Sequence, residues 1–134
     1  MPVKNNLTKA ERLHSKTLID KLFKNGTRKY SYGIIFYNLL TDKTLSTDHK
    51  DVSIIVVARK KQFKHAVDRN RIKRLFREAY RNNKYILDNL IPDDKHLMLG
   101  MIYVGNGLPE YSFCFKHVQN YLTTLATQFK NQLK

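Results

Sequence analysis

The stretch VSIIVVARKKQFKHAVDRNRIKRLFREAYR, residues 52–81, joins an expected strand to an expected helix through a short basic loop. Residues 52–58 form an unbroken apolar, β-branched run, which is typical of a strand buried on both faces. From residue 66 the apolar positions follow a helical period, and we expect this helix to continue to about residue 89. One face of it is apolar and consists of Ile72, Leu75, Phe76 and Ala79. This pattern predicts a sheet covered by the helix.

Two more helices are expected on either side of this unit. Residues 15–25 form a short amphipathic helix, with Ser15 as its N-cap and Gly26 as a left-handed stop. Residues 112–134 are helical by period. One side of that last helix is apolar and comprises Val118, Tyr121, Leu122, Leu125 and Phe129. Both helices therefore have a face to bury.

Two further strands are indicated by dense aromatic and β-branched residues, at 28–40 and 96–104. The polar segment 41–50 predicts a turn, so we expect 28–40 and 52–58 to pair as a hairpin. The order of elements is then α-β-β-α-β-α. This order predicts an α+β fold, an α/β sandwich with a small, mostly antiparallel sheet.

Size and composition indicate one domain spanning residues 1–134, since a chain of 134 residues is of ordinary single-domain length. The net charge is +14, which points to a polyanionic partner. No apolar run is long enough for a membrane span, and Cys114, the single cysteine, allows no intrachain disulfide. We therefore expect a cytoplasmic protein without a membrane partner.

The positive charge is concentrated in residues 59–84, where eleven Lys and Arg stand against two acids, a net of +9. On the expected helix, cations recur every four residues at Arg69, Lys73, Arg77 and Arg81, with Asn70 and Arg74 beside them. Like charges at this spacing repel, and the acids that would form i,i+4 salt bridges are missing. Either His65 or Asp68 is expected to cap the helix. The pattern favours phosphate binding over a merely solvated face.

The string DRNRIKRLFREAYR (68–81), preceded by Ala66, Val67, Lys60 and Lys61, resembles the signature of the bacterial ribonuclease P protein subunit. The opening RLHSKTLIDKLFKNGTR (12–28) is also similar to that family. The resemblance implies a sandwich with a left-handed crossover, against the usual handedness. It also implies a subunit of a ribonucleoprotein endoribonuclease, in which a catalytic RNA removes the 5′ leader of precursor tRNA with Mg²⁺ bound mainly by the RNA subunit and substrate.

The same resemblance implies one protein per ribonuclease P RNA and contacts to precursor tRNA, and we expect no DNA partner. We also expect no catalytic residue or metal ligand in the protein, because the sequence shows no acid–base pair or carboxylate cluster and its five histidines are scattered. The expected RNA-binding residues are Arg69, Asn70, Arg71, Lys73, Arg74, Arg77, Lys60, Lys61, Arg81 and Arg12. The leader-binding cleft is expected at Ile19, Phe23, Ile35 and Tyr37. Ile19 stands where many members have an aromatic residue, and Lys64 where a glycine is common.

Two other functions remain open at this point. A non-catalytic RNA-binding or ribosome-associated module would use the same basic helix, and a membrane-surface protein would use it as an amphipathic anchor. The expected cleft residues and the tyrosines Tyr30 and Tyr32 are equally well accounted for as core or half-buried strand residues. Replacing Arg69, Lys73 and Arg77 together is predicted to weaken RNA binding without lowering the melting temperature.

Overall fold

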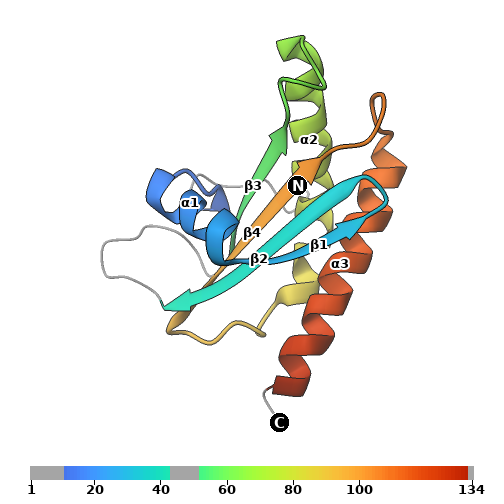
Figure 1. Cartoon of the computed structure of the whole chain (residues 1–134). Coiled ribbons are helices and arrows are strands. Elements are labelled where there is room, and N and C mark those ends of the chain that lie inside the picture. Colours follow the sequence, from blue (N-terminus) through green and yellow to red (C-terminus); the bar gives the residue numbers. More distant parts are fainter. Residues whose placement is uncertain (1–10, 43–51, 133–134) are drawn as a thin grey trace, which may run out of the picture.

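The structure is a computed structural model that describes residues 11–42 and 52–132 (Figure 1). The elements follow in the order α1 (Lys16–Asn25), β1 (Thr27–Ser31), β2 (Ile34–Asp42), β3 (Val52–Ala58), α2 (Ala66–Asn83), η2 (Lys84–Leu87), β4 (Lys95–Tyr103) and α3 (Tyr111–Gln132). The strands form one sheet in the order β1-β2-β4-β3. The pairs β1–β2 and β2–β4 are antiparallel, and β3–β4 is parallel. This confirms the α+β fold with a mostly antiparallel sheet.

The predicted hairpin between residues 28–40 and 52–58 is wrong, because β4 lies between β2 and β3. The chain leaves β3, passes through α2 and returns as β4 parallel to β3, so this connection is a crossover. Parallel neighbours need such a long connection, which α2 supplies. The left-handed sense of the crossover stays a prediction.

The element order also needs one correction, since residues 28–40 contain two strands, β1 and most of β2, instead of one. A two-residue turn at Tyr32 and Gly33 reverses the chain, and both residues have positive φ, 48° and 84°. Positive φ at both central residues is what a type I′ hairpin turn requires. Asparagine and glycine are the usual signals for this turn, so Tyr32 concealed it.

The two faces of the sheet carry separate cores. On one face, α2 and α3 cover a large cluster that includes Phe36, Ile54 and Leu99. The predicted apolar face of α2 is confirmed, since Ile72, Phe76 and Ala79 are fully buried. On the other face, α1 covers a small cluster around Leu13, Leu22 and Met98. Because α1 has only ten residues, it covers only part of its face (Figure 1).

The predicted helix ends are partly right. Ser15 caps α1 by accepting a hydrogen bond from the Leu18 amide (3.4 Å). Gly26 is not a left-handed stop, since its φ is −72°; a Cβ there would lie 2.4 Å from the Leu22 carbonyl oxygen, so close approach requires the glycine. The long helix ends at Asn83 instead of residue 89. At Asn83 φ is −119°, and η2 begins at the next residue.

Candidate nucleic-acid interface

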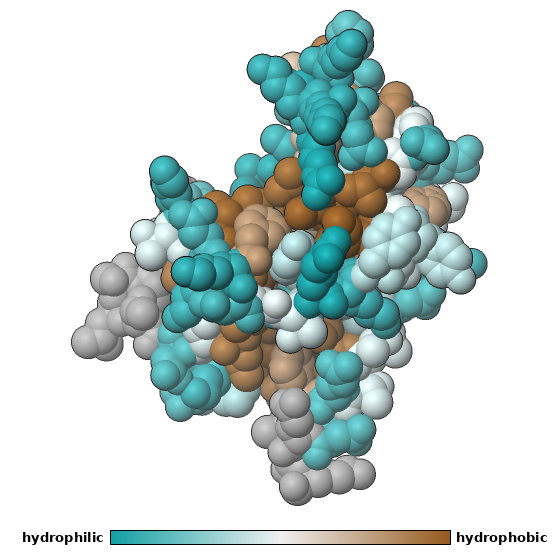
Figure 2. Space-filling view, in the orientation of Figure 1, coloured by the Kyte–Doolittle hydropathy of each residue, from teal (hydrophilic) through white to brown (hydrophobic). Residues whose placement is uncertain are grey.

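The cations of α2 fall into two groups. The first group is exposed and consists of Arg71 and Arg74 of α2, with Asn70 beside them and Lys60 and Lys61 of the preceding loop. The second group is half-buried and is the ladder of Arg69, Lys73, Arg77 and Arg81, which runs along the length of α2. Figure 2 shows hydrophilic side chains over the end of the molecule where β3 leads into α2. We call the five exposed residues the basic surface.

Arg69 has a local structural role. One terminal nitrogen of its guanidinium donates to the backbone carbonyls of Phe63 (2.7 Å) and Lys64 (2.9 Å). These carbonyls belong to the loop between β3 and α2, so Arg69 fixes the path of that loop. Of the two residues expected to cap α2, His65 occupies the N-cap position but makes no side-chain cap hydrogen bond, and Asp68 lies in the first turn.

The same loop is also fastened to the sheet. Phe63 is buried and stacks on Tyr103, with ring centroids 5.8 Å apart. Gln62 donates from its side-chain amide to the Val104 carbonyl (2.9 Å). Phe63 is turned inward and Gln62 is hydrogen-bonded at the surface, while Lys60 and Lys61 are exposed. The loop therefore presents its lysines from a fixed backbone.

Arg12 and Arg77 come together from distant parts of the sequence. Arg12 forms an isolated parallel bridge with Ile54 of β3, which places it along the edge of the sheet. Burial of the Arg77 guanidinium, together with the positive charge of Arg12, lowers the pKa of Arg77. Neither arginine has an acidic partner among the described residues. An external anion would relieve this repulsion.

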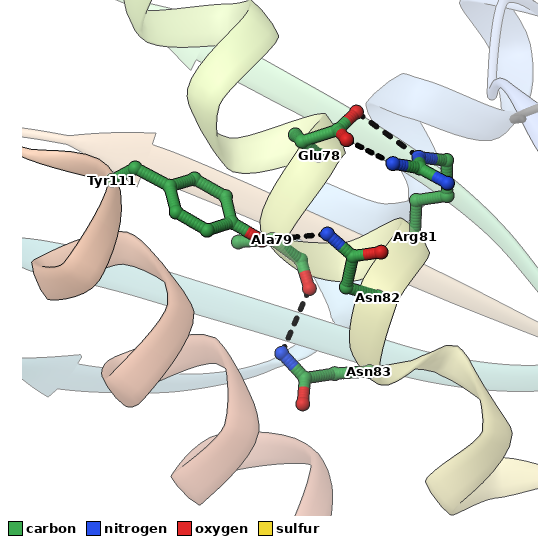
Figure 3. A network of polar contacts seen from close by, with 6 residues as sticks. All are labelled: Glu78, Ala79, Arg81, Asn82, Asn83 and Tyr111. Atoms are coloured by element: carbon green, nitrogen blue, oxygen red, sulfur yellow. Dashed lines mark hydrogen bonds and ion pairs between the residues drawn. The ribbon is translucent and has the colours of Figure 1, made fainter. Parts of the chain in front are cut away.

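Arg81 differs from the other ladder residues because it does have an acid. Its guanidinium forms a two-point ion pair with Glu78, which lowers the pKa of Glu78 and raises that of Arg81 (Figure 3). The ladder has no acid at i,i+4, as expected, but this pair at i,i+3 spacing was not foreseen. Nearby, Asn82 donates to the Tyr111 hydroxyl (2.6 Å) and ties α2 to α3 (Figure 3).

The other candidate surface lies on the α1 face of the sheet. Phe23 of α1 sits over Gly100, where an added Cβ would be 3.2 Å from the ring. It meets Tyr37 edge-on, with ring centroids 4.9 Å apart and an interplanar angle of 87°. Tyr37 and Gly100 are partners in the β2–β4 register, so the three residues form one unit. Both rings are half-buried and so keep solvent-facing area.

The other two expected cleft residues are less accessible. Ile19 packs against the small cluster under α1. Ile35 (5% exposed) and Ile102 (8%) lie in one row across the sheet with the half-buried Val57, and none of the three belongs to the cluster under α1. Figure 2 shows a hydrophobic area over the strands beside α1, bordered by hydrophilic side chains. We call Phe23, Tyr37 and the row of Ile35, Ile102 and Val57 the open sheet face.

Gly100 was missed from sequence, although a glycine inside an apolar strand run is a signal of close approach by another segment. Arg12 was expected to bind RNA, but its proximity to Arg77 was not foreseen, because that contact depends on the path of the N-terminal segment. Val57, which borders the loop of Lys60 and Lys61, was also not singled out. Val57 belongs to the open sheet face and lies three residues before Lys60 of the basic surface, so the two surfaces approach each other at the end of β3.

The described residues contain one hydrogen-bonded serine–histidine pair, Ser53 Oγ to His96 Nε2 at 2.7 Å, and both residues are buried. No group of three or more His, Cys, Asp or Glu in residues 11–42 and 52–132 is placed to hold a metal ion.

Asp93 lies with Glu11, Lys84 and Asp88 in a separate cavity of about 400 Å³. None of the helices within that part of the chain has the length and apolarity of a membrane span.

The comparisons with known proteins agree with one another. The family model for ribonuclease P matches residues 7–126. The ribonuclease P protein component of Porphyromonas gingivalis is 31% identical over 128 residues, 93% of this chain and 90% of the relative. That of Chlorobium phaeobacteroides is 37% identical over 108 residues, 75% and 73% of the two chains.

Two solved structures show the same fold. The RNase P protein from Thermotoga maritima has a TM-score of 0.62 at 20% identity, covering 85% of this chain and 96% of that protein. The RNase P protein from Staphylococcus aureus has a TM-score of 0.57 at 21% identity, covering 90% and 99%.

Proposed function

Because the chain belongs to the ribonuclease P protein family, we propose that its two surfaces divide the RNA of that enzyme between them. The protein is a subunit of ribonuclease P, the ribonucleoprotein endoribonuclease of tRNA 5′ processing, and ribonuclease P RNA is its partner. The basic surface binds the RNA subunit. The open sheet face binds the 5′ leader of precursor tRNA.

The observation that supports the first assignment is the cation pattern. Arg71 and Arg74 are exposed at the crest of α2, and Lys60 and Lys61 extend the charge along the loop. Phosphate contacts dominate the affinity of RNA-binding proteins, and arginine can contact phosphate with two N–H groups at once. Asn70 is exposed beside Arg71 and makes no hydrogen bond within the described chain, which favours an RNA contact for it.

The second assignment rests on the aromatic pair. Phe23 and Tyr37 offer ring area at the border of an apolar floor, and base stacking on aromatic rings holds single strands with little sequence preference. Ile35 contributes to the floor, since it is too buried to stack. Ile19 acts through the packing of α1, which positions Phe23.

We assign the chemistry to the RNA. Mg²⁺ is bound mainly by the RNA subunit and the substrate, and the protein lowers the Mg²⁺ demand by offsetting phosphate repulsion. One copy of residues 1–134, acting as one domain in the cytoplasm, binds one RNA.

The test is cleavage of labelled precursor tRNA at low Mg²⁺ by the protein alone, a bacterial ribonuclease P RNA alone, and the mixture. Correct 5′ maturation only in the mixture is expected. Tight RNA binding without stimulated cleavage would instead indicate a non-catalytic RNA-binding module. Cleavage by the protein alone would overturn the assignment of catalysis to the RNA.

A further inference from the structure

The tip of the β1–β2 hairpin carries an unusually placed aromatic residue. Tyr32 is 75% exposed and has φ of 48°, in the left-handed region. Bulky residues rarely occupy this region, and the first central position of such a turn normally favours asparagine, aspartate or glycine. The hairpin would form more easily with asparagine at this position. Tyrosine therefore contributes something other than turn geometry.

The ring of Tyr32 lies against α3. Its centroid is 5.0 Å from that of His117, with an interplanar angle of 36°. His117 in turn meets Phe113, with centroids 4.5 Å apart. Phe113 packs against the main core, so the aromatic series continues from the core to the exposed tip. Tyr32 is thus braced on one side and open to solvent on the other.

Two cations adjoin this series. Lys29 and His117 line the same small hollow, about 50 Å³, between β1 and α3. Lys116 precedes His117, and its charge, after the effect of burial, helps to lower the pKa of His117. Both lysines are exposed. The combination of a braced aromatic ring and nearby positive charge is typical of sites that bind single-stranded nucleic acid.

We propose that Tyr32 and His117 form a second stacking platform, which holds an unpaired base of single-stranded RNA beyond the open sheet face. Tyr30 connects the two places, because the β1–β2 register puts it opposite Ile35, on the same face as Tyr37. Tyr30 is 64% exposed. The Tyr32 ring lies against α3, on the opposite face of the sheet from Tyr30. An RNA strand leaving the open sheet face at Tyr30 would therefore pass around the free edge of β1, at the hairpin tip, to reach Tyr32. The platform extends the proposed leader site and rests on it.

The test is the binding of a fluorescein-labelled twelve-nucleotide oligouridylate to the full chain, measured by anisotropy over a range of salt concentrations. Tyr32→Asn removes the ring and keeps a residue suited to the turn. We expect it to weaken binding by about 5- to 150-fold, the effect of one lost base stack. The salt dependence should stay unchanged, because stacking releases no counterions. Tyr32→Phe should retain the affinity.

Matched controls establish whether the Tyr32 ring itself holds a base. Tyr85→Asn removes another exposed tyrosine (61%), on η2, and should leave the affinity unchanged. On an abasic twelve-mer, Tyr32→Asn and the unmodified chain should bind equally. The variant's melting temperature should not fall, since asparagine relieves the turn.

The outcomes distinguish this proposal from the one on which it rests. If Phe23→Ala weakens oligouridylate binding but Tyr32→Asn does not, the platform is wrong and the leader site stands. If Tyr32→Asn weakens binding of the abasic strand equally, the contact is not a base stack and the platform is wrong. If the unmodified chain fails to bind oligouridylate, both proposals are wrong.

Discussion

Replacing Arg71 and Arg74 with glutamine is expected to weaken binding to ribonuclease P RNA without affecting the stability of the protein. Both side chains are exposed on α2, and neither makes a hydrogen bond or ion pair within the described chain. Substituting such residues changes stability little, and removing like charges from one helix face lowers repulsion. Arg69 is unsuitable for this test because it holds the loop carbonyls of Phe63 and Lys64. The expectation that a variant lacking Arg69 keeps its melting temperature is revised accordingly.

The magnitude follows from counterion release. Each phosphate contact contributes about 0.7–0.9 to the slope of log affinity against log salt. Losing two contacts should lower the slope by about 1.4–1.8. If affinities converge near 1 M salt, this corresponds to a loss of about 15- to 30-fold near 0.15 M.

The assay is filter binding to ribonuclease P RNA between about 0.1 and 0.5 M salt, together with thermal melting. The control variant carries Lys21→Gln and Lys130→Gln, two exposed lysines on α1 and α3, which remove the same net charge elsewhere. An equal loss of slope in the control would mean that the general field of the protein, and not the basic surface, binds the RNA. An unchanged slope in the Arg71 and Arg74 variant would refute the assignment.

Two further predictions concern the interior. Gly100→Ala places a Cβ 3.2 Å from Leu22 and Phe23, so we expect a loss of about 1–3 kcal/mol by urea unfolding and weaker oligouridylate binding, with unchanged affinity for ribonuclease P RNA. Equal losses for both RNAs would contradict the separation of the two surfaces. Burial raises the pKa of Cys114 to about 12, so the native thiol should resist a disulfide reagent at pH 8 and react only after unfolding. Since the unfolded thiol ionises near its ordinary pKa while the native one stays protonated, stability should fall as pH rises from about 9 toward 12, and a urea midpoint that rises over this range would oppose this.

Local properties could be predicted from the sequence, and long-range ones could not. The buried face of α2, with Ile72 and Phe76, follows from a period of about 3.6 residues, and the cations follow from composition. The position of β4 between β2 and β3 could not be predicted, because strand order depends on contacts across the whole chain. The hydrogen bond from Arg69 to the Phe63 carbonyl was missed for the same reason, since it depends on the path of the loop.

The site shows the same division. Phe23 and Tyr37 were proposed through a family resemblance, and the structure brings their rings into contact. What made this possible was not visible in either segment alone: Gly100 from a third strand leaves room for α1. The residue that most violates local rules, Tyr32 at positive φ, is also the one with the most exposed ring among the described tyrosines. Residues in strained backbone conformations are often found at functional sites, where the surrounding structure offsets the cost of the strain.

The crossover explains how one small sheet can present the two proposed RNA surfaces. Because β3 and β4 are parallel neighbours, α2 must return along one face of the sheet, which buries Phe76 and turns Arg71 and Arg74 outward. The opposite face depends on the ten-residue α1, which among the described residues covers only part of it (Figure 1). The loop after β3 lies where the two faces meet, and Phe63 and Gln62 hold it there. A helix with exposed cations and a partly uncovered apolar sheet face are therefore consequences of the same topology.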